Sequence, residues 1–270
     1  MKTRIVAAAI LLPLLLLVVL AAPKIFTAIL FALMAAIAAY ELMVGTGLVK
    51  QTWLYIYAMI SAFWCVLWSG LQICYAWLLL GIVVFWVLLF VEIMRSEMKL
   101  PFEKVAVAIA AGVVVPLMFS SLVRIHATEN GRFFILIPFV MAFLSDSGAY
   151  FAGLKFGKRK LAPTISPKKT VEGVIGGVIG SIIGMVIYSY VLQAAFRFQI
   201  NYMYATFYGA VGACAGVFGD LCFSVIKRQT GIKDYGNLIP GHGGILDRFD
   251  SMMLIGPLAE ILLMILPMAV

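Results

Sequence analysis

The segment from Ser224 to Asp250 holds the residues of this chain that are best suited to chemistry. Its 27 residues include four Lys or Arg, three Asp, one of the two His and five Gly, in a chain that is 64% hydrophobic. A helix in lipid cannot carry so many charges, and the glycines around His242 together with Pro240 exclude regular structure in its second half. A polar segment kept between two apolar runs favours chemistry at a membrane surface.

Two carboxylates end this segment. Asp247 and Asp250 lie three residues apart at the expected start of the last apolar run, a spacing that places both on one face of a helix. A single carboxylate at a helix start commonly only balances the helix dipole. Two of them, next to the flexible turn at 242–244, favour a divalent metal site. Oxygen ligands of this kind suit Mg²⁺, which shares its other positions with water and phosphate oxygens.

Polar side chains also interrupt the apolar runs. Asp220, Ser224 and Lys227 follow the spacing of one helical face, with Arg228 beside them. Asp146 stands inside another run, where a carboxylate that faces lipid costs roughly 2.5–3.5 kcal/mol. We therefore expect Asp146 to face the bundle interior or a wet cavity and to have a cation, a metal or a proton as its partner.

A lysine-rich segment offers an anion site. Thr170 can cap the helix expected from residue 171, and Lys168 and Lys169 directly precede it. Helix-terminal amides with adjacent lysines suit phosphate. The alternative interpretation is that these lysines only set the membrane topology. Their position directly before a helix start favours phosphate binding over that alternative.

Together these groups describe a site for a magnesium-bound polyphosphate at a membrane face. The chain has no P-loop, no kinase glycine loop and no arrangement of residues for a Ser or Cys nucleophile. Because the site is expected at a membrane surface, the second substrate is expected to be a lipid that enters from the bilayer. The residues alone therefore predict phosphoryl or nucleotidyl transfer to a lipid.

The elements that position these residues are transmembrane helices. With 12% charged residues and apolar runs of about 20 residues without strand-like alternation, the chain is predicted to be an all-α polytopic membrane bundle, and a soluble enzyme is excluded. A signal peptide is the alternative for the first run, but that run is long for one and leads directly into the next, so we favour a retained helix. The nine predicted spans are 5–22, 25–44, 53–69, 71–92, 105–123, 133–153, 171–192, 203–224 and 251–270.

The distribution of charge predicts the orientation. If the N-terminus is cytoplasmic, 16 of the 20 Lys and Arg fall on cytoplasmic segments, as the positive-inside rule requires. The net charge of +8 is thus a topology signal and no indication of nucleic-acid binding. We expect an integral protein of a bacterial cytoplasmic membrane whose active site faces the cytoplasm.

The two halves of the chain differ in kind. Residues 1–132 form a hydrophobic multi-span region, and residues 133–270 are the predicted catalytic region. Glu41 and Glu92 lie near span ends, where a solvated or capped terminus is favoured over a functional role. Glu260 lies deeper, and the sequence assigns it no role.

Small residues line one face of the span at 171–192. Their three- and four-residue spacing predicts close packing against another helix. This face permits a homodimer without requiring one. The residues are Gly173, Gly176, Gly177, Gly180 and Gly184.

At these same positions the sequence resembles the signature of phosphatidate cytidylyltransferases, also called CDP-diacylglycerol synthases. The first group of matching runs is Ser224-x-x-Lys227-Arg228, Lys233-Asp234, Gly236, Ile239–Gly244 and Asp247-Arg248-x-Asp250. The second group, earlier in the chain, is Asp146-Ser147-x-Ala149-Tyr150 and Ile165–Thr170 followed by Glu172-Gly173. The resemblance covers about residues 144–250, and the first half matches only as a hydrophobic multi-span region.

The resemblance implies that CTP and phosphatidate react to give CDP-diacylglycerol and pyrophosphate, with Mg²⁺ required and a second cation left open. It implies metal binding by Asp220, Asp247 and Asp250, with Asp146 a weaker candidate, and catalytic roles for those three aspartates and Lys168. Its implied substrate-binding residues are Ser166, Lys168, Lys169, Thr170, Ser224, Lys227, Arg228, Lys233, His242 and Arg248.

Two alternatives stay open. One is a CTP-dependent lipid kinase, or a cytidylyltransferase that acts on another lipid. The other is a transporter, because interior carboxylates and glycine-rich helices also suit ion pathways. The gathering of polar groups at one membrane face and the lack of an inverted repeat disfavour transport.

Overall fold

The fold is a bundle of long apolar helices. The computed structural model describes residues 13–97, 99–239 and 241–269. Within these residues, seven helices are long and apolar enough to cross a membrane. They are Lys24–Gly45, Thr52–Leu71, Tyr75–Arg95, Phe102–Ala127, Gly131–Phe156, Val171–Phe196 and Tyr202–Gln229. The predicted polytopic all-α bundle is confirmed.

Two of the nine predicted spans differ from this picture. The first, 5–22, lies partly outside the described residues, and its residues 13–21 are helical. The ninth corresponds to α12, Met252–Ile265, which has only 14 residues and contains Pro257. A helix needs about 20 apolar residues to cross the hydrocarbon of a bilayer. The predicted count of nine spans is therefore not confirmed.

The chain divides into two compact units. The first consists of Met1–Arg132 and Gln229–Phe249, and the second consists of Phe133–Arg228 and Asp250–Val270. One boundary falls where the sequence changes character, after Arg132. The segment Gln229–Phe249, however, packs with the N-terminal half although it follows the second unit in the chain. The division of function between residues 1–132 and 133–270 stays a prediction.

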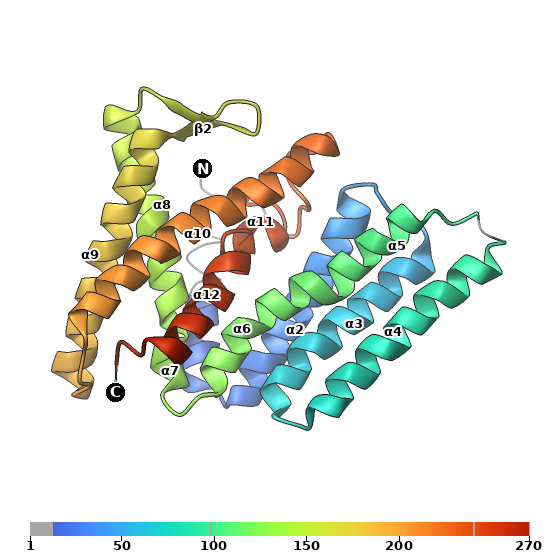
Figure 1. Ribbon diagram of the computed structural model, residues 1–270, viewed down its shortest axis with the longest axis horizontal. Coiled ribbons are helices and arrows are strands. Elements are labelled where there is room, and N and C mark those ends of the chain that lie inside the picture. The colour runs from blue at the N-terminus through green and yellow to red at the C-terminus, as the bar shows by residue number, and fades with distance from the viewer. Residues whose placement is uncertain (1–12, 98, 240, 270) are drawn as a thin grey trace. The chain divides into compact units, whose positions relative to one another are not determined.

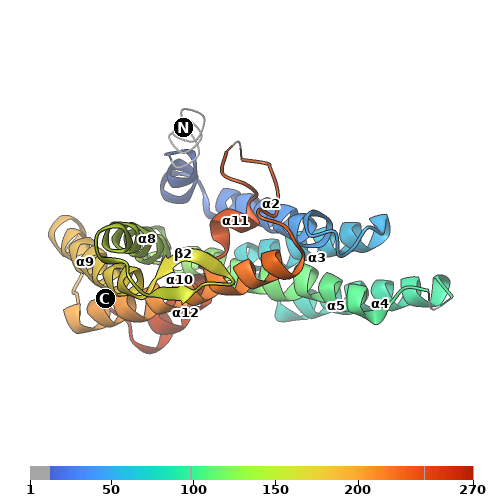
Figure 2. The ribbon, with the colours of Figure 1, turned by 90° about the horizontal axis from the view of Figure 1, so that it is seen from above.

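The first unit is built around α3, which packs against α2, α4 and α6 (Figures 1 and 2). Its core includes a cluster of three rings in which Phe249 lies 6.3 Å from Phe31 and 5.1 Å from Phe119, measured between ring centroids. Phe249 thus anchors the returning segment. The elements are α2 (Lys24–Tyr40), η1 (Glu41–Gly45), α3 (Thr52–Leu71), α4 (Tyr75–Arg95), α5 (Phe102–Ile109), η2 (Ala110–Val114), α6 (Val115–Ala127) and α11 (Leu246–Phe249).

One proline shapes the fourth candidate span. Pro116 has no N–H to donate, and the π-helical turn η2 ends two residues before it. The carbonyl left without its helical donor is that of Gly112, four residues earlier. Ser61 on α3 donates its hydroxyl to this oxygen at 2.9 Å. The irregular turn is thus satisfied by a neighbouring helix, as a lipid environment requires.

The second unit contains the long helices α8, α9 and α10. The short helix α7 (Gly131–Phe134) contains the boundary between the units. The elements of the second unit are α8 (Leu136–Phe156), β1 (Lys160–Ala162), β2 (Ser166–Thr170), α9 (Val171–Phe196), α10 (Tyr202–Gln229) and α12 (Met252–Ile265). The glycine face of α9 packs on α8: a Cβ at Gly180 would lie 2.6 Å from the Leu144 carbonyl oxygen, and one at Gly177 3.0 Å from that of Ser145. The predicted close helix contact is confirmed, and its partner is α8 of the same chain.

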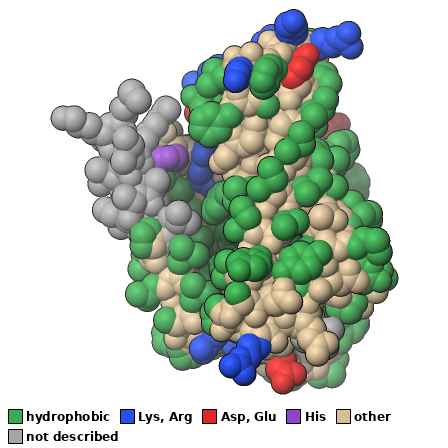
Figure 3. All heavy atoms as spheres, turned by 90° about the vertical axis from the view of Figure 1, so that its left-hand side faces the viewer, with side chains coloured by type: hydrophobic (Ala, Val, Ile, Leu, Met, Phe, Trp, Pro, Cys, Tyr) green, Lys and Arg blue, Asp and Glu red, His purple; other side chains and the backbone are tan. Residues whose placement is uncertain are grey.

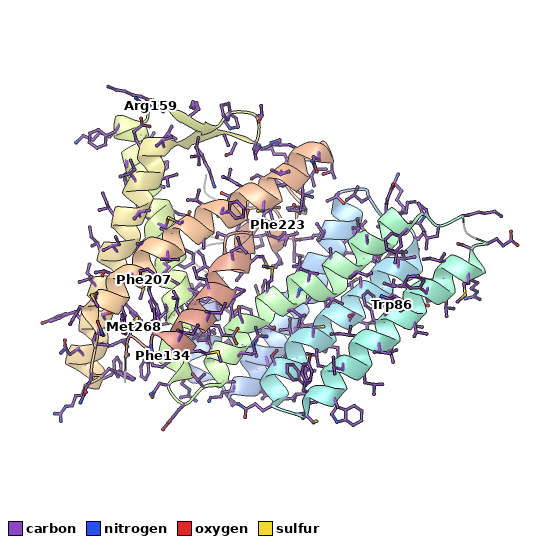
Figure 4. The ribbon with its side chains drawn as sticks, viewed as in Figure 1. Trp86, Phe134, Arg159, Phe207, Phe223 and Met268 are labelled. Atoms are coloured by element: carbon purple, nitrogen blue, oxygen red, sulfur yellow. The ribbon has the colours of Figure 1, made fainter. Side chains whose placement is uncertain are left out.

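A small hairpin joins α8 to α9, which the all-α prediction missed. Strands β1 and β2 pair antiparallel, with Lys160 opposite Thr170. The Glu172 carboxylate accepts hydrogen bonds from the amides of Lys158 and Arg159 at 3.0 and 3.2 Å, which holds the entry to the hairpin. Figure 4 labels Arg159 at this end of the unit, and Figure 3 shows Lys and Arg at both ends of a face with an apolar middle. Such a pattern is typical of a membrane-spanning unit.

The contact between α8 and α9 makes a testable demand on residue 176. A Cβ at Gly176 would collide with that of Ala152 and lie 2.8 Å from the Gly148 carbonyl oxygen. We expect Gly176→Ala to destabilise the protein by about 1–3 kcal/mol, the usual cost of overpacking, seen as a lower thermal midpoint in detergent. Ala194→Leu adds more volume at an exposed position of the same helix and serves as the control. Equal midpoints for Gly176→Ala and the unsubstituted protein would contradict the packing argument.

Candidate active site

The predicted site residues fall in both units. Those in the second unit are Asp146, Ser166, Lys168, Lys169, Thr170, Asp220, Ser224, Lys227, Arg228 and Asp250, and those in the first are Lys233, His242, Asp247 and Arg248.

Helix α10 presents the first group. Asn201 caps its start by accepting the amides of Met203 and Tyr204 with its side-chain oxygen, at 3.1 and 3.2 Å. Near its other end Ser224 donates its hydroxyl to Asp220 at 3.0 Å. Ser224 and Lys227 are both buried. The predicted common face for Asp220, Ser224 and Lys227 is confirmed.

The hairpin supplies a cation to that face. The Lys169 ammonium lies 2.5 Å from the Asp220 carboxylate, and both side chains are partly exposed. Arg228 donates its Nε–H to the Ile165 carbonyl at 3.0 Å, so α10 also holds the turn of the hairpin. Lys169 stands next to Thr170, which caps α9 by accepting the Gly173 amide at 3.1 Å, as predicted. The rigid start of α9 thereby fixes where Lys169 reaches.

A second lysine and aspartate pair is buried more deeply. Lys227 and Asp250 are 8% and 9% exposed, and their charged atoms lie 3.9 Å apart. Asp250 also accepts the Ser251 amide at 2.8 Å. A Cβ added at Gly219 would lie 2.9 Å from the Asp250 carbonyl oxygen, which places Asp250 beside the turn of α10 that carries Asp220.

We call Lys169, Asp220, Ser224, Lys227 and Asp250 the lysine–aspartate cluster. It draws on β2, α10 and the turn before α12, and its two negative and two positive charges balance. Carboxylates of this kind can take a divalent cation, and lysines can take phosphate. The set fits Mg²⁺, because that ion commonly uses one or two carboxylates together with water and substrate phosphates. Among the described residues, no three His, Cys, Asp or Glu are grouped so as to hold a metal ion by themselves.

The other predicted residues of the second unit are less enclosed. Lys168 is exposed and Ser166 is half-buried, both on β2. Asp146 lies in the middle of α8 and is exposed. This exposure contradicts the first of the two expected settings, the bundle interior. A wet cavity stays as the predicted alternative.

In the first unit, Asp247 organises a glycine-rich loop. One oxygen of its carboxylate accepts the amides of Tyr235 at 2.7 Å and Gly244 at 3.0 Å. Gly243 has a φ of +86°, which a residue with a Cβ rarely adopts. Around it the Ile239 amide donates to the Gly243 carbonyl at 2.9 Å. His242 is half-buried, and Lys233 and Arg248 are exposed.

The two C-terminal aspartates do not share one helical turn. Asp247 lies in the one-turn helix α11, whereas Asp250 lies in a turn before α12 begins at Met252. The prediction that both stand at the first turn of the last span is wrong. Instead residues 250 and 251 form a turn between α11 and α12. The Asp247 carboxylate accepts the amides of Tyr235 and Gly244, and that of Asp250 accepts the amide of Ser251.

The sequence interpretation missed Glu41. We expected a solvated or capped span end without a functional role, but Glu41 is 4% exposed. Its two oxygens accept the amides of Ile245 and Leu246, at 3.0 and 2.8 Å. An intramembrane carboxylate is a signal of function by itself. Its partners lie more than 200 residues away in the chain, so no local pattern could identify them.

The buried pair allows a test of the cluster. Lys227→Met removes the charge beside Asp250, and breaking a buried pair costs about 3–5 kcal/mol. We expect a large drop in the thermal midpoint of the purified protein. The double variant Lys227→Met/Asp250→Asn removes both charges and should recover a substantial part of the loss. Equal destabilisation by the single and double variants would show that the two charges do not compensate each other.

Comparisons with known proteins identify the family of the chain. The chain matches the model of the cytidylyltransferase family over residues 2–266. It is 37% identical over 163 residues to the phosphatidate cytidylyltransferase of Bacillus subtilis (strain 168), which covers 60% of this chain and 59% of that protein.

Two further relatives carry the same name. The phosphatidate cytidylyltransferase of Haemophilus influenzae is 39% identical over 127 residues, or 47% of this chain and 44% of the relative. That of Staphylococcus aureus (strain COL) is 41% identical over 135 residues, or 50% of each. The chain thus spans about half the length of the curated relatives it matches. Since the family model matches nearly the whole chain, the chain belongs to the cytidylyltransferase family.

Proposed function

We propose that this protein transfers the cytidylyl group of CTP to phosphatidate at a membrane surface, giving CDP-diacylglycerol and pyrophosphate. The observation that carries the proposal is the lysine–aspartate cluster. Two aspartates and two lysines from separate elements of a membrane-spanning unit lie together there. Family membership and the names of the relatives support the same reaction.

The reaction needs little acid–base chemistry from the protein. An oxygen of the phosphatidate phosphate, already anionic near neutral pH, attacks the α-phosphorus of CTP. A new P–O bond forms, the bond between the α-phosphorus and its bridging oxygen breaks, and pyrophosphate leaves with the electron pair. Catalysis then rests on positioning and on neutralising negative charge.

Named side chains would perform these two tasks. Lys169 and Lys227 would turn from their aspartates to phosphate oxygens, so no charge is left without a partner. Lys168, Arg228 and Arg248 are exposed cations that would bind the remaining phosphates. We propose further that Ser166, Thr170, Ser224, Lys233 and His242 shape the substrate pocket.

Asp220, Asp247 and Asp250 are the proposed ligands of Mg²⁺, with Asp146 as a weaker candidate. When bound, the ion would supply neutralisation of charge on the α-phosphate and the leaving pyrophosphate. Their hard carboxylate oxygens match the preference of Mg²⁺. A second cation is a further part of this proposal.

The proposed setting is a bacterial cytoplasmic membrane, with the N-terminus and the active site on the cytoplasmic side. The asymmetry of Lys and Arg along the chain supports this orientation. CTP and Mg²⁺ are then available from the cytoplasm, and phosphatidate from the inner leaflet.

The reaction is tested with purified protein, CTP, phosphatidate vesicles and Mg²⁺. We expect label from the cytidine ring to enter the lipid fraction, release of one pyrophosphate per lipid product, and loss of both signals with excess EDTA. Transfer of the γ-phosphate alone would identify a CTP-dependent lipid kinase and contradict the proposal. Absence of any lipid product would also contradict it and leave transport as the alternative function.

The metal assignment is tested at Asp247. We expect Asp247→Asn to abolish turnover while membrane expression stays intact, because the amide keeps the size of the side chain but lacks the charge that binds a cation. Glu103→Gln removes one charge at an exposed position on α5 and should keep full activity. Normal turnover by Asp247→Asn, measured as CDP-diacylglycerol formed, would remove Asp247 from the metal site.

A further inference from the structure

Glu41 is a buried carboxylate from the N-terminal half of the chain. It accepts hydrogen bonds from the glycine-rich loop that precedes Asp247. It stands where α2 passes into the π-helical turn η1 and is 4% exposed. Its Oε1 accepts the amide of Ile245 at 3.0 Å and its Oε2 accepts that of Leu246 at 2.8 Å. Both oxygens are therefore used as acceptors for backbone groups of one loop.

The loop is shaped around this side chain. A Cβ at Gly236 would lie 2.6 Å from Oε1 of Glu41, and a Cβ at Gly244 would collide with the same carboxylate. A Cβ at Gly45, in the π-helical turn itself, would collide with the Tyr235 carbonyl oxygen. Three glycines thus allow η1 and the loop to approach each other closely.

The chemistry of the contact requires a carboxylate of this length. Glutamine would offer one acceptor oxygen and turn an NH₂ donor towards a backbone N–H, which leaves a buried amide unsatisfied. Aspartate is shorter by one methylene and could not span both amides from the same backbone position. Hydrogen bonds to a charged acceptor are also about twice as strong as neutral ones.

The two amides bound by Glu41, those of Ile245 and Leu246, directly precede Asp247. The Asp247 carboxylate takes two further amides of the same loop, those of Tyr235 and Gly244. The amide of Gly244, which Asp247 accepts, and the amides of Ile245 and Leu246, which Glu41 accepts, are consecutive in the chain. Because the two carboxylates share three consecutive amides of one loop, a shift at Glu41 would move the backbone that positions Asp247.

We propose that Glu41 is a positioning residue for the reaction: it fixes the backbone at Gly236 and at residues 244–246 and thereby sets the place of Asp247. The role rests on the proposed function, because it concerns the loop that carries a proposed metal ligand. It also makes the first unit a participant in the reaction.

The first experiment compares Glu41→Gln with Glu92→Gln in the full-length protein. Glu92 is a largely buried carboxylate at the end of α4, and its partners are the side chains of Tyr57 and Arg95. Hydrogen exchange of peptides that cover residues 235–246 should become faster by about tenfold or more in Glu41→Gln, as expected for lost amide hydrogen bonds. It should stay unchanged in Glu92→Gln.

Turnover is measured on the same samples. We expect kcat of Glu41→Gln to fall by about tenfold or more while the KM for CTP changes less than about threefold, the sign of lost transition-state alignment. Unchanged exchange in the loop would overturn the proposal, and so would faster exchange with full kcat. If the unsubstituted protein forms no CDP-diacylglycerol, the proposed function fails, and the exchange result still decides whether Glu41 holds the loop.

A second experiment uses the close contact with Gly244. Gly244→Ala should lower the thermal midpoint strongly in the unsubstituted protein, since the new methyl group meets the Glu41 carboxylate. In a Glu41→Ala background the same substitution should cost much less, because the space is vacated. Equal losses in both backgrounds would show that Glu41 does not shape the loop.

Discussion

The structure depends on one constraint: every charge carried into an apolar bundle must be balanced where it stands. Lys227 and Asp250 are almost fully buried and pair with each other, and Lys169 pairs with Asp220. Glu41 is held by two amides. An uncompensated charge at these depths would cost several kcal/mol. The same balance suits the proposed reaction, in which each lysine would exchange its aspartate for a phosphate oxygen and each carboxylate would exchange its lysine for a cation.

Backbone groups obey the same constraint and explain the irregular parts of the fold. Pro116 interrupts a span, and the carbonyl of Gly112 is satisfied by Ser61 from a neighbouring helix. The hairpin between α8 and α9 is held by Glu172 at its entry and by Arg228 at its turn. Small residues make these solutions possible, since the glycine face of α9 lets two helix backbones approach closely. Lys169 lies on β2 directly before α9, so the packing of α8 against α9 fixes the position of its backbone.

The segment Gln229–Phe249 links the N-terminal half of the chain to the proposed site, because it packs with that half and carries Asp247. Phe249 packs in the aromatic core of the first unit, and Glu41 accepts backbone amides of the loop that precedes Asp247. A half of the chain that shows little chemistry in its sequence therefore supports a residue proposed for catalysis. Flexible glycines would leave Asp247 poorly placed by themselves, and the buried carboxylate of a distant helix restricts them.

The sequence by itself determined the class of fold, most of the membrane spans, the common face of Asp220, Ser224 and Lys227, and the cap at Thr170, because these follow from hydropathy and helical spacing. It also carried the family signature. Only the tertiary structure decided that Lys169 pairs with Asp220, that a turn separates Asp247 from Asp250, and that Glu41 is buried against Ile245 and Leu246. These contacts join residues up to about 200 positions apart, and local periodicity carries no information on which distant backbone groups a side chain will meet.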